Sequence, residues 1–162
     1  TMQNVFQVIF FLSGLYNIPP NELYCVSEAV YFESRGESVE GQIAVSEVIH
    51  NRVKSKKYPN SVCKVVHQAK KYNGKILRNK CQFSYYCDGR KETIRDKEAW
   101  ITSSHVAAFS FLKNILLTYR NKEGNYIDIT KGATHYHTTG VDPEWNKKLT
   151  FVKRVGKHEF YK

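Results

Sequence analysis

The sequence predicts an α+β fold that is mainly helical, with a small antiparallel β element in its C-terminal part. Three observations support this class. Helical periodicity recurs through residues 5–53 and again over 96–114. Short alternating apolar runs follow only after Gly124. No apolar run reaches the roughly 18 residues that a membrane-spanning helix requires, and a chain of 162 residues is predicted to form one domain over 1–162.

The first expected element is an apolar helix over 5–15, which Gly14 and the pair Pro19 and Pro20 would end. We expect this helix to be buried. It also resembles the core of a signal peptide, but no Lys or Arg precedes it, as a secretory leader would require. Thr1 stands before Met2, so an upstream segment can be missing.

Two further helices are expected over 21–35 and 41–53. Asn21 is a good N-cap for the first, and Gly36 suits its C-cap position. The apolar stripe of the first helix contains Leu23, Val26 and Val30. The stripe of the second contains Ala44, Val45, Val48 and Ile49.

Residues 54–92 show little periodicity, which predicts a long irregular segment with one short helix near 62–68. Such a segment in a compact domain is usually functional. Asp96 can then cap a long helix that runs to about Asn114 or slightly beyond. The apolar stripe of that helix comprises Ile101, His105, Ala108, Leu112 and Ile115. We expect the histidine in this stripe to be a hydrogen-bonded core residue.

The chain after Gly124 changes to short alternating runs that are typical of small strands or extended segments. These runs cover residues 126–130, 133–138, 149–155 and 159–161. They supply the β part of the predicted fold.

The formal net charge of +10 is unevenly distributed. Residues 1–51 carry six acidic and one basic side chain, 52–91 carry twelve basic and one acidic, and 92–162 carry twelve basic and eight acidic, giving −5, +11 and +4. A basic excess predicts a polyanionic partner such as nucleic acid, an anionic membrane or an acidic wall polymer. The basic middle segment is either solvated surface or a docking region.

Four cysteines, Cys25, Cys63, Cys81 and Cys87, allow three complete pairings, and their spacing does not select among them. No C-x-x-C pair is present, which disfavours a zinc ribbon. Cys81 and Cys87 flank a short aromatic segment and can close a small loop. Free thiols in a reducing compartment are an equal alternative.

Glu33 is the candidate catalytic residue. On a helix it shares an arc with the apolar stripe of residues 21–35, so its carboxyl group is expected to be partly desolvated. Desolvation raises a carboxyl pKa, which suits a general acid near neutral pH. Its place near a helix end would let a cleft reach it. The alternative is an ordinary solvated glutamate.

The neighbouring acids are less informative. Glu37 can sit beside Glu33 or be exposed, and Arg35 can pair with either. Glu28 and Glu47 fall opposite their apolar stripes and are expected to be solvated.

Several ordered blocks are similar to the spore-cortex-lytic, or cell-wall hydrolase, family. They are AVYFESRGE at 29–37 with EGQIAV at 40–45 and NRV at 51–53, CQFSYYCDG at 81–89, GATHYH at 132–137 with DPEW at 142–145, and VGKHEFY at 155–161. The resemblance covers about residues 23–161. It implies a lysozyme-like, lytic-transglycosylase-like domain acting on peptidoglycan glycan strands, and it aligns Glu33 with the catalytic glutamate.

The resemblance also favours a sugar-binding groove. Its candidate lining residues are Ser34, Glu37, Gln82, Phe83, Ser84, Tyr85, His135, Tyr136, His137 and Trp145. Amide and hydroxyl groups bond to ring hydroxyls, while aromatic faces pack against sugar C–H faces. The aromatic members can instead belong to the core.

A metal site is not expected. His135 and His137 are two residues apart, so a strand would place both on one face. A metal would need a third ligand, and the spacing supplies none. We therefore predict no metal and no cofactor.

The predicted reaction is cleavage of the MurNAc–GlcNAc β-1,4 bond by a lytic transglycosylase that works with one carboxyl group. The alternative is a hydrolytic muramidase that pairs Glu33 with Glu37, Asp88 or Glu47. A remote alternative is a nucleic-acid-binding module built on residues 52–91.

The expected partners are peptidoglycan glycan strands and, for the basic segment, anionic envelope polymers. No nucleic acid and no membrane insertion are expected, and the chain is predicted to be a monomer. It would act on the bacterial wall, in the periplasm, in the spore cortex or outside the cell. Its compactness favours a phage lysin or a trimmed catalytic domain.

Overall fold

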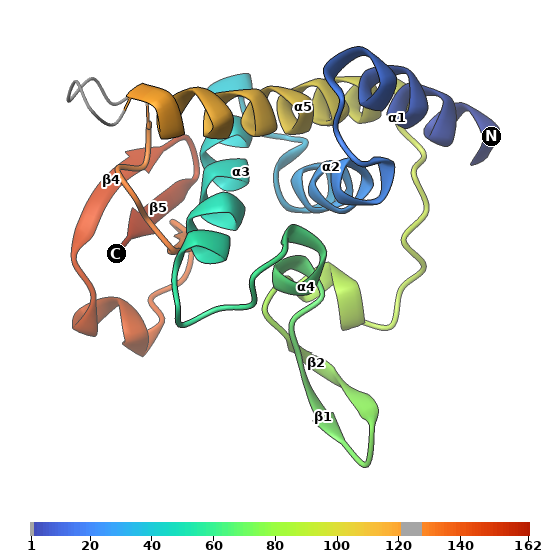
Figure 1. The fold of residues 1–162 in the computed structure, drawn as a ribbon. Coiled ribbons are helices and arrows are strands. Elements are labelled where there is room, and N and C mark those ends of the chain that lie inside the picture. The colour runs from blue at the N-terminus through green and yellow to red at the C-terminus, as the bar shows by residue number, and fades with distance from the viewer. Residues whose placement is uncertain (1, 121–127) are drawn as a thin grey trace.

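The computed structural model describes residues 2–120 and 128–162 (Figure 1). The α-helices in these ranges are α1 (Met2–Tyr16), α2 (Pro20–Ser34), α3 (Val39–Lys54), α4 (Val62–Val66) and α5 (Lys97–Arg120). The strands are β1 (Ala69–Tyr72), β2 (Lys75–Cys81), β3 (His135–Thr138), β4 (Phe151–Val155) and β5 (His158–Tyr161). Two short 3-10 helices are η1 (Ser84–Cys87) and η2 (Glu144–Lys148). This arrangement confirms the predicted mainly helical α+β class.

Helix α3 joins the helical part of the molecule to the C-terminal sheet. Helix α5 lies across α1, α2 and α3, and Ile49 of α3 belongs to the core that these helices share (Figure 1). On another face of α3, Val45 and Val48 pack against Phe160 of β5. The site described below lies where these two parts meet.

The two sheets are small and antiparallel. The C-terminal sheet has the order β3-β5-β4, with His135 opposite Tyr161 and Thr138 opposite His158. The second sheet is the β1–β2 hairpin, which extends away from α4 and the rest of the fold (Figure 1).

The hairpin contradicts the prediction that residues 54–92 are irregular apart from one short helix. Asn73 and Gly74 form its turn with φ of 48° and 76°, the left-handed conformation that a two-residue hairpin turn needs. The Asn-Gly pair was therefore the overlooked signal. Its strands are largely exposed, so no apolar alternation marks them.

The ends of the helices differ from the prediction in two places. Helix α2 begins at Pro20 with Pro19 in the N-cap position, so the cap predicted at Asn21 is wrong. Proline suits a first turn because the missing amide hydrogen would have had no helical acceptor. The chain leaves α2 through a right-handed Arg35 and makes no left-handed turn at Gly36.

The first helix is buried on one face only. Ile9 and Leu12 are buried, whereas Phe10, Phe11 and Leu15 are 61%, 67% and 60% exposed, so the prediction of a buried helix is wrong for that second face. Within residues 2–120 and 128–162, no helix is long and apolar enough to cross a membrane.

The predicted stripe of α5 is correct at Ala108, which is buried, but wrong at three of its five positions. Ile101, His105 and Ile115 are exposed, and the His105 ring bonds to the carbonyl oxygen of Ile101 at 2.8 Å instead of lying in the core. The buried face holds mainly small residues, among them Ser103, Ser104, Ala107 and Ser110. Small side chains let α5 approach α2 and α3 closely, and periodicity of large apolar residues cannot reveal such a face. The predicted cap is confirmed, because the Asp96 carboxylate accepts the Ala99 amide at 3.0 Å.

The predicted strand over 126–130 is not found in its described part. Residues 129 and 130 belong to a turn, residue 128 has no regular secondary structure, and residues 126 and 127 lie outside the described ranges. The other three predicted strands correspond to β3, β4 and β5, with ends shifted by one or two residues.

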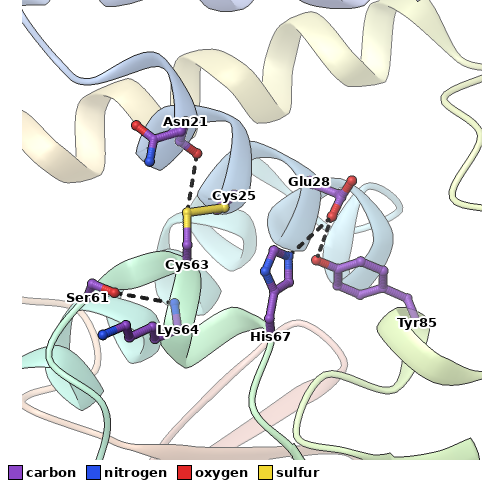
Figure 2. The surroundings of a disulfide bond; sticks show 8 residues. All are labelled: Asn21, Cys25, Glu28, Ser61, Cys63, Lys64, His67 and Tyr85. Atoms are coloured by element: carbon purple, nitrogen blue, oxygen red, sulfur yellow. Dashed lines mark hydrogen bonds and ion pairs between the residues drawn. A yellow bond between two sulfur atoms is a disulfide. The ribbon is translucent and has the colours of Figure 1, made fainter. Parts of the chain in front are cut away.

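Two disulfides answer the open question of cysteine pairing. Cys25–Cys63 joins α2 to α4 with its Cα atoms 5.3 Å apart, and Figure 2 shows it beside the Ser61 hydroxyl that caps α4. Cys81–Cys87 closes the short loop that carries residues 82–86. The described cysteines include no free thiol.

Candidate active site

A cleft of about 890 Å³ opens between the end of α2, the segment 82–95 and the strands β3 and β5. A second cavity of about 500 Å³ adjoins it near the turn after α2. The two cavities share Phe32, Glu33, Arg35, Thr138 and His158 as lining residues. They therefore form one groove, and Glu33 lies at the junction of its two parts.

Glu33 occupies the last turn of α2 and is half-buried. The Tyr136 hydroxyl on β3 donates to its carboxyl oxygen at 2.8 Å. Within the described chain, no Lys, Arg or His nitrogen lies within 4.0 Å of this carboxyl group. Burial raises the pKa of Glu33, and the Tyr136 hydrogen bond and the more distant charge of Arg52 lower it in part. The net upward shift keeps a larger protonated fraction near neutral pH.

The loop closed by Cys81 and Cys87 contributes four predicted site residues to the cleft lining. Gln82 and Ser84 are exposed there. Phe83 is fully buried, and Tyr85 is buried with its ring stacked on Phe32 at 4.9 Å between centroids. The loop thus combines two solvent-facing polar groups with two aromatic residues that form the wall behind them.

Ser34 and Glu37 line the second cavity. The Ser34 hydroxyl is buried and donates to the Val30 carbonyl oxygen at 2.8 Å. The Glu37 carboxylate accepts the Lys157 amide at 3.3 Å, and a Cβ atom on Gly156 would lie 2.4 Å from it. Glu37 therefore ties the turn after α2 to the β4–β5 turn.

His135, His137 and Trp145 form an aromatic cluster beside the groove. Both histidine rings lie against Trp145, at 5.2 and 5.5 Å between centroids, in agreement with the prediction that they share a face of a strand. His137 lines the cleft, but His135 and Trp145 are not among its lining residues. The described residues contain no group of three or more His, Cys, Asp or Glu side chains arranged to hold a metal ion.

Arg52 is a cleft residue that the sequence analysis did not select. It is 5% exposed, its Nε donates to the Thr134 carbonyl oxygen at 2.8 Å, and its guanidinium lies over the rings of Tyr58 and Phe83. Its Nη1 is buried without a hydrogen-bond partner among the described residues. The only sequence signal was its place in the block NRV at 51–53.

Glu28 and Glu47 are buried, so the prediction that they are solvated is wrong. Glu28 accepts the Tyr85 hydroxyl at 3.2 Å and lies 4.0 Å from His67 (Figure 2). Glu47 pairs with Lys113 on α5 and accepts the amide and hydroxyl of Thr130, each at 2.8 Å. Elements distant in sequence cover the helix faces that lack apolar residues, and polar partners on those elements satisfy both carboxylates.

Residues 36–161 match the sequence model of the Cell Wall Hydrolase family, so the chain belongs to this family. The curated relatives include the spore cortex-lytic enzyme of Bacillus subtilis (strain 168), which is 46% identical over 142 residues. That match covers 86% of this chain and 37% of the relative. The spore cortex-lytic enzyme of Bacillus cereus is 28% identical over 143 residues, with coverage of 88% and 44%. The chain thus spans less than half the length of these relatives.

Two solved structures share the fold. One is the catalytic domain of the germination-specific lytic transglycosylase SleB from Bacillus anthracis, with a TM-score of 0.58, 29% identity and coverage of 88% of this chain and 94% of that one. The other is the catalytic domain of the Bacillus cereus SleB protein, with a TM-score of 0.58, 28% identity and coverage of 89% and 91%. The resemblance and the fold inferred from the sequence are both confirmed.

Proposed function

We propose that this chain degrades peptidoglycan by cleaving the MurNAc–GlcNAc β-1,4 bond as a lytic transglycosylase, with Glu33 as general acid and then general base. One observation carries the proposal: a partly buried carboxyl group with a raised pKa faces the groove and is bound by a single hydroxyl. Family membership and the likeness to SleB catalytic domains support the substrate class.

The reaction begins with proton transfer from the Glu33 carboxyl group to the glycosidic oxygen. The bond from this oxygen to the anomeric carbon of MurNAc then breaks, and the oxygen leaves as the hydroxyl group of GlcNAc. The 6-hydroxyl of the same MurNAc attacks the anomeric carbon, and the Glu33 carboxylate takes the proton of that hydroxyl. The product is a 1,6-anhydro end, and no water is consumed. The tethered nucleophile gives the attack the advantage of proximity.

Two of the three candidate second carboxylates, Glu37 and Glu47, have surroundings that support a mechanism with one carboxyl group. Glu37 is occupied by the Lys157 amide, and Glu47 is paired with Lys113 and lines neither part of the groove. The substrate's own acetamido group can stabilise the oxocarbenium-like state in place of a second protein carboxylate.

A hydrolytic muramidase is the second candidate, because Asp88 lines the same cleft as Glu33. In that reaction, water attacks the anomeric carbon with the help of a second carboxylate. The mass of the released muropeptides separates the two candidates, since anhydro products are one water lighter than products with reducing ends.

The test is the variant Glu33→Gln with Glu40→Gln as a matched control. Glu40 is exposed on α3 and pairs only loosely with Lys153, at 3.7 Å. We expect Glu33→Gln to release muropeptides and to clear wall turbidity about 10²–10⁴-fold more slowly than the wild type, whereas Glu40→Gln behaves like the wild type. Normal lysis by a folded Glu33→Gln variant would refute the proposal.

We further propose that the chain acts as a monomer on the bacterial wall rather than on nucleic acid. Its two disulfides favour a location outside the reducing cytoplasm. The names of the relatives make spore cortex peptidoglycan one candidate substrate, and a phage lysin acting on a host wall is another. Muropeptide release from purified cortex and vegetative walls compares these substrates directly.

A further inference from the structure

We propose that four basic residues on the rim of the cleft, Arg35, Arg90, Lys91 and Arg95, bind the carboxylates of the peptide stem that muramic acid carries. This cationic rim would make the enzyme select glycan strands with charged stems. The inference rests on the proposed glycan-cleaving function and names the part of the substrate that the same cleft recognises.

The first side of the cationic rim is built on the buried residue Tyr31. Its hydroxyl accepts the backbone amides of Arg95 and Asp96 at 3.3 and 3.2 Å. The guanidinium of Arg35 lies over the Tyr31 ring, 4.8 Å from its centroid, and donates to the Tyr31 carbonyl oxygen at 3.4 Å. Arg35 and Arg95, which are far apart in sequence, are thereby both held at Tyr31.

The loop that carries the other two rim residues is also fixed. The Asp88 carboxylate accepts the Arg90 amide at 2.8 Å, and the Asp88 carbonyl oxygen accepts Arg78 Nε at 3.3 Å. Gly89 has a φ of 84°, and the Arg78 guanidinium packs where its Cβ atom would be. The loop therefore presents Arg90 and Lys91 to the cleft while the neighbouring Arg78 is occupied.

The cleft carries an excess of positive charge. Its lining includes the four rim residues and Arg52, against the acidic residues Glu33, Asp88 and Glu92. The four rim residues are exposed, and in the described part of the chain none has a carboxylate oxygen within 4.0 Å. Cations on backbone segments that the fold fixes, and without anionic partners there, are available to an anionic ligand.

The substrate supplies such a ligand at the right place. The GlcNAc units of the glycan carry no charge. The peptide stem attached to each muramic acid, in contrast, ends in free carboxylates. A stem leaving the sugar beside Glu33 would pass over the cleft rim. Arginine binds carboxylates through paired hydrogen bonds, which gives geometric selection as well as attraction.

The experiment compares two forms of peptidoglycan free of teichoic acid. One keeps its stem carboxylates, and in the other these are converted to amides, so the stems keep their length and lose their negative charge. We expect wild-type kcat/KM to be roughly tenfold higher on the charged form, as expected for a small number of charge-assisted hydrogen bonds. The preference should diminish with added salt.

The rim variant is Arg90→Gln/Lys91→Gln/Arg95→Gln, and its preference for the charged form should fall to the small residual value that Arg35 alone supports. The control is Lys70→Gln/Lys75→Gln/Lys80→Gln on the exposed hairpin, which removes the same charge away from the cleft lining. It should keep the wild-type preference. Lys91→Gln alone, as a milder change, should give an intermediate ratio.

Three results would overturn the proposal: no preference in the wild type, an undiminished preference in the rim variant, or equal loss in both triple variants. Sedimentation of the Glu33→Gln variant with each insoluble peptidoglycan measures the same preference without cleavage. Stronger binding to the charged form supports the rim even if the proposed reaction is wrong. Equal binding to both forms rejects the rim even if Glu33 proves catalytic.

Discussion

Glu33 and Glu47 lie on neighbouring helices, and their surroundings assign them opposite roles. Burial raises the pKa of both side chains. Glu33 has one hydroxyl partner and faces the groove. Glu47 is closed in by Lys113, by the amides of Ile129 and Thr130 and by the Thr130 hydroxyl. A buried carboxyl group is thus a candidate catalyst only where its partners are few and substrate can reach it.

The contacts of Glu47 indicate a structural role rather than a catalytic one. Its contacts join α3 to α5 and to the turn before β3. Strand β3 contains Tyr136, whose hydroxyl donates to Glu33. The Asp128 carboxylate accepts the Thr130 and Gly132 amides, at 3.0 and 2.9 Å, and extends the same cluster. Glu47 therefore stabilises the frame on which the groove is built.

The largest expected effect separates the two glutamates by activity. Glu33→Gln should lower the cleavage rate by about 10²–10⁴-fold, the usual contribution of a general acid or base. Glu47→Gln, assayed well below its melting temperature, should retain most of the wild-type rate. Muropeptide release measured under initial-rate conditions checks both. Equal losses in the two folded variants would contradict the distinction.

The free energy of unfolding should show the reverse order: Glu47→Gln should be strongly destabilised and Glu33→Gln should not. Glu47→Gln leaves the Lys113 charge buried without its partner, which costs about 3–5 kcal/mol of unfolding free energy. Glu33→Gln should not destabilise the chain. A raised carboxyl pKa in the folded state means that ionisation opposes folding, so removing that group helps most at pH values above the folded pKa. Urea unfolding at pH 5 and pH 8 measures both effects.

The control for this stability difference is Glu47→Gln/Lys113→Met. Removing both charges eliminates the unpaired cation, so the double variant should be more stable than Glu47→Gln alone. If the single and double variants unfold at the same urea concentration, the ion pair is not what makes Glu47 structural.

A second structural link joins α2 to α4. The Cys25–Cys63 disulfide closes a loop with a sequence separation of 38, and its loss should cost about 4 kcal/mol on a chain-entropy estimate. Cys25→Ser/Cys63→Ser should therefore lower the melting temperature while the folded fraction still cleaves peptidoglycan. An inactive variant with a wild-type melting temperature would mean that this link serves the site directly.

The sequence was sufficient for features that depend on local periodicity. The arc shared with Leu23, Val26 and Val30 correctly predicted that Glu33 is partly buried, and the ordered blocks identified the family. The strands β3, β4 and β5 were predicted from short runs in which apolar and polar residues alternate. In each case the information lies within one element or in motifs that the family retains.

Features that depend on contacts between distant segments could not be predicted. Lys113 is 66 residues from Glu47, so a helical wheel placed that glutamate in solvent. Tyr136 meets Glu33 across 103 residues, and it was selected only through the resemblance. Arg35 and Arg95 meet at Tyr31 with no pattern that connects them. Such pairs become visible only when the fold brings their elements together.

The smallest expected effect concerns the hydroxyl that binds Glu33. Its hydrogen bond favours the ionised carboxylate, so Tyr136→Phe should raise the pKa of Glu33 further. A general acid loses activity as pH rises through its pKa, so the alkaline limb of the pH–rate profile should move to higher pH. The shift should be about one pH unit, since a hydrogen bond to a charged group is worth roughly 1.5 kcal/mol. Tyr72→Phe on the exposed hairpin is the control and should leave the profile unchanged. A limb that stays in place or moves to lower pH in a folded Tyr136→Phe variant would show that this titration does not belong to Glu33.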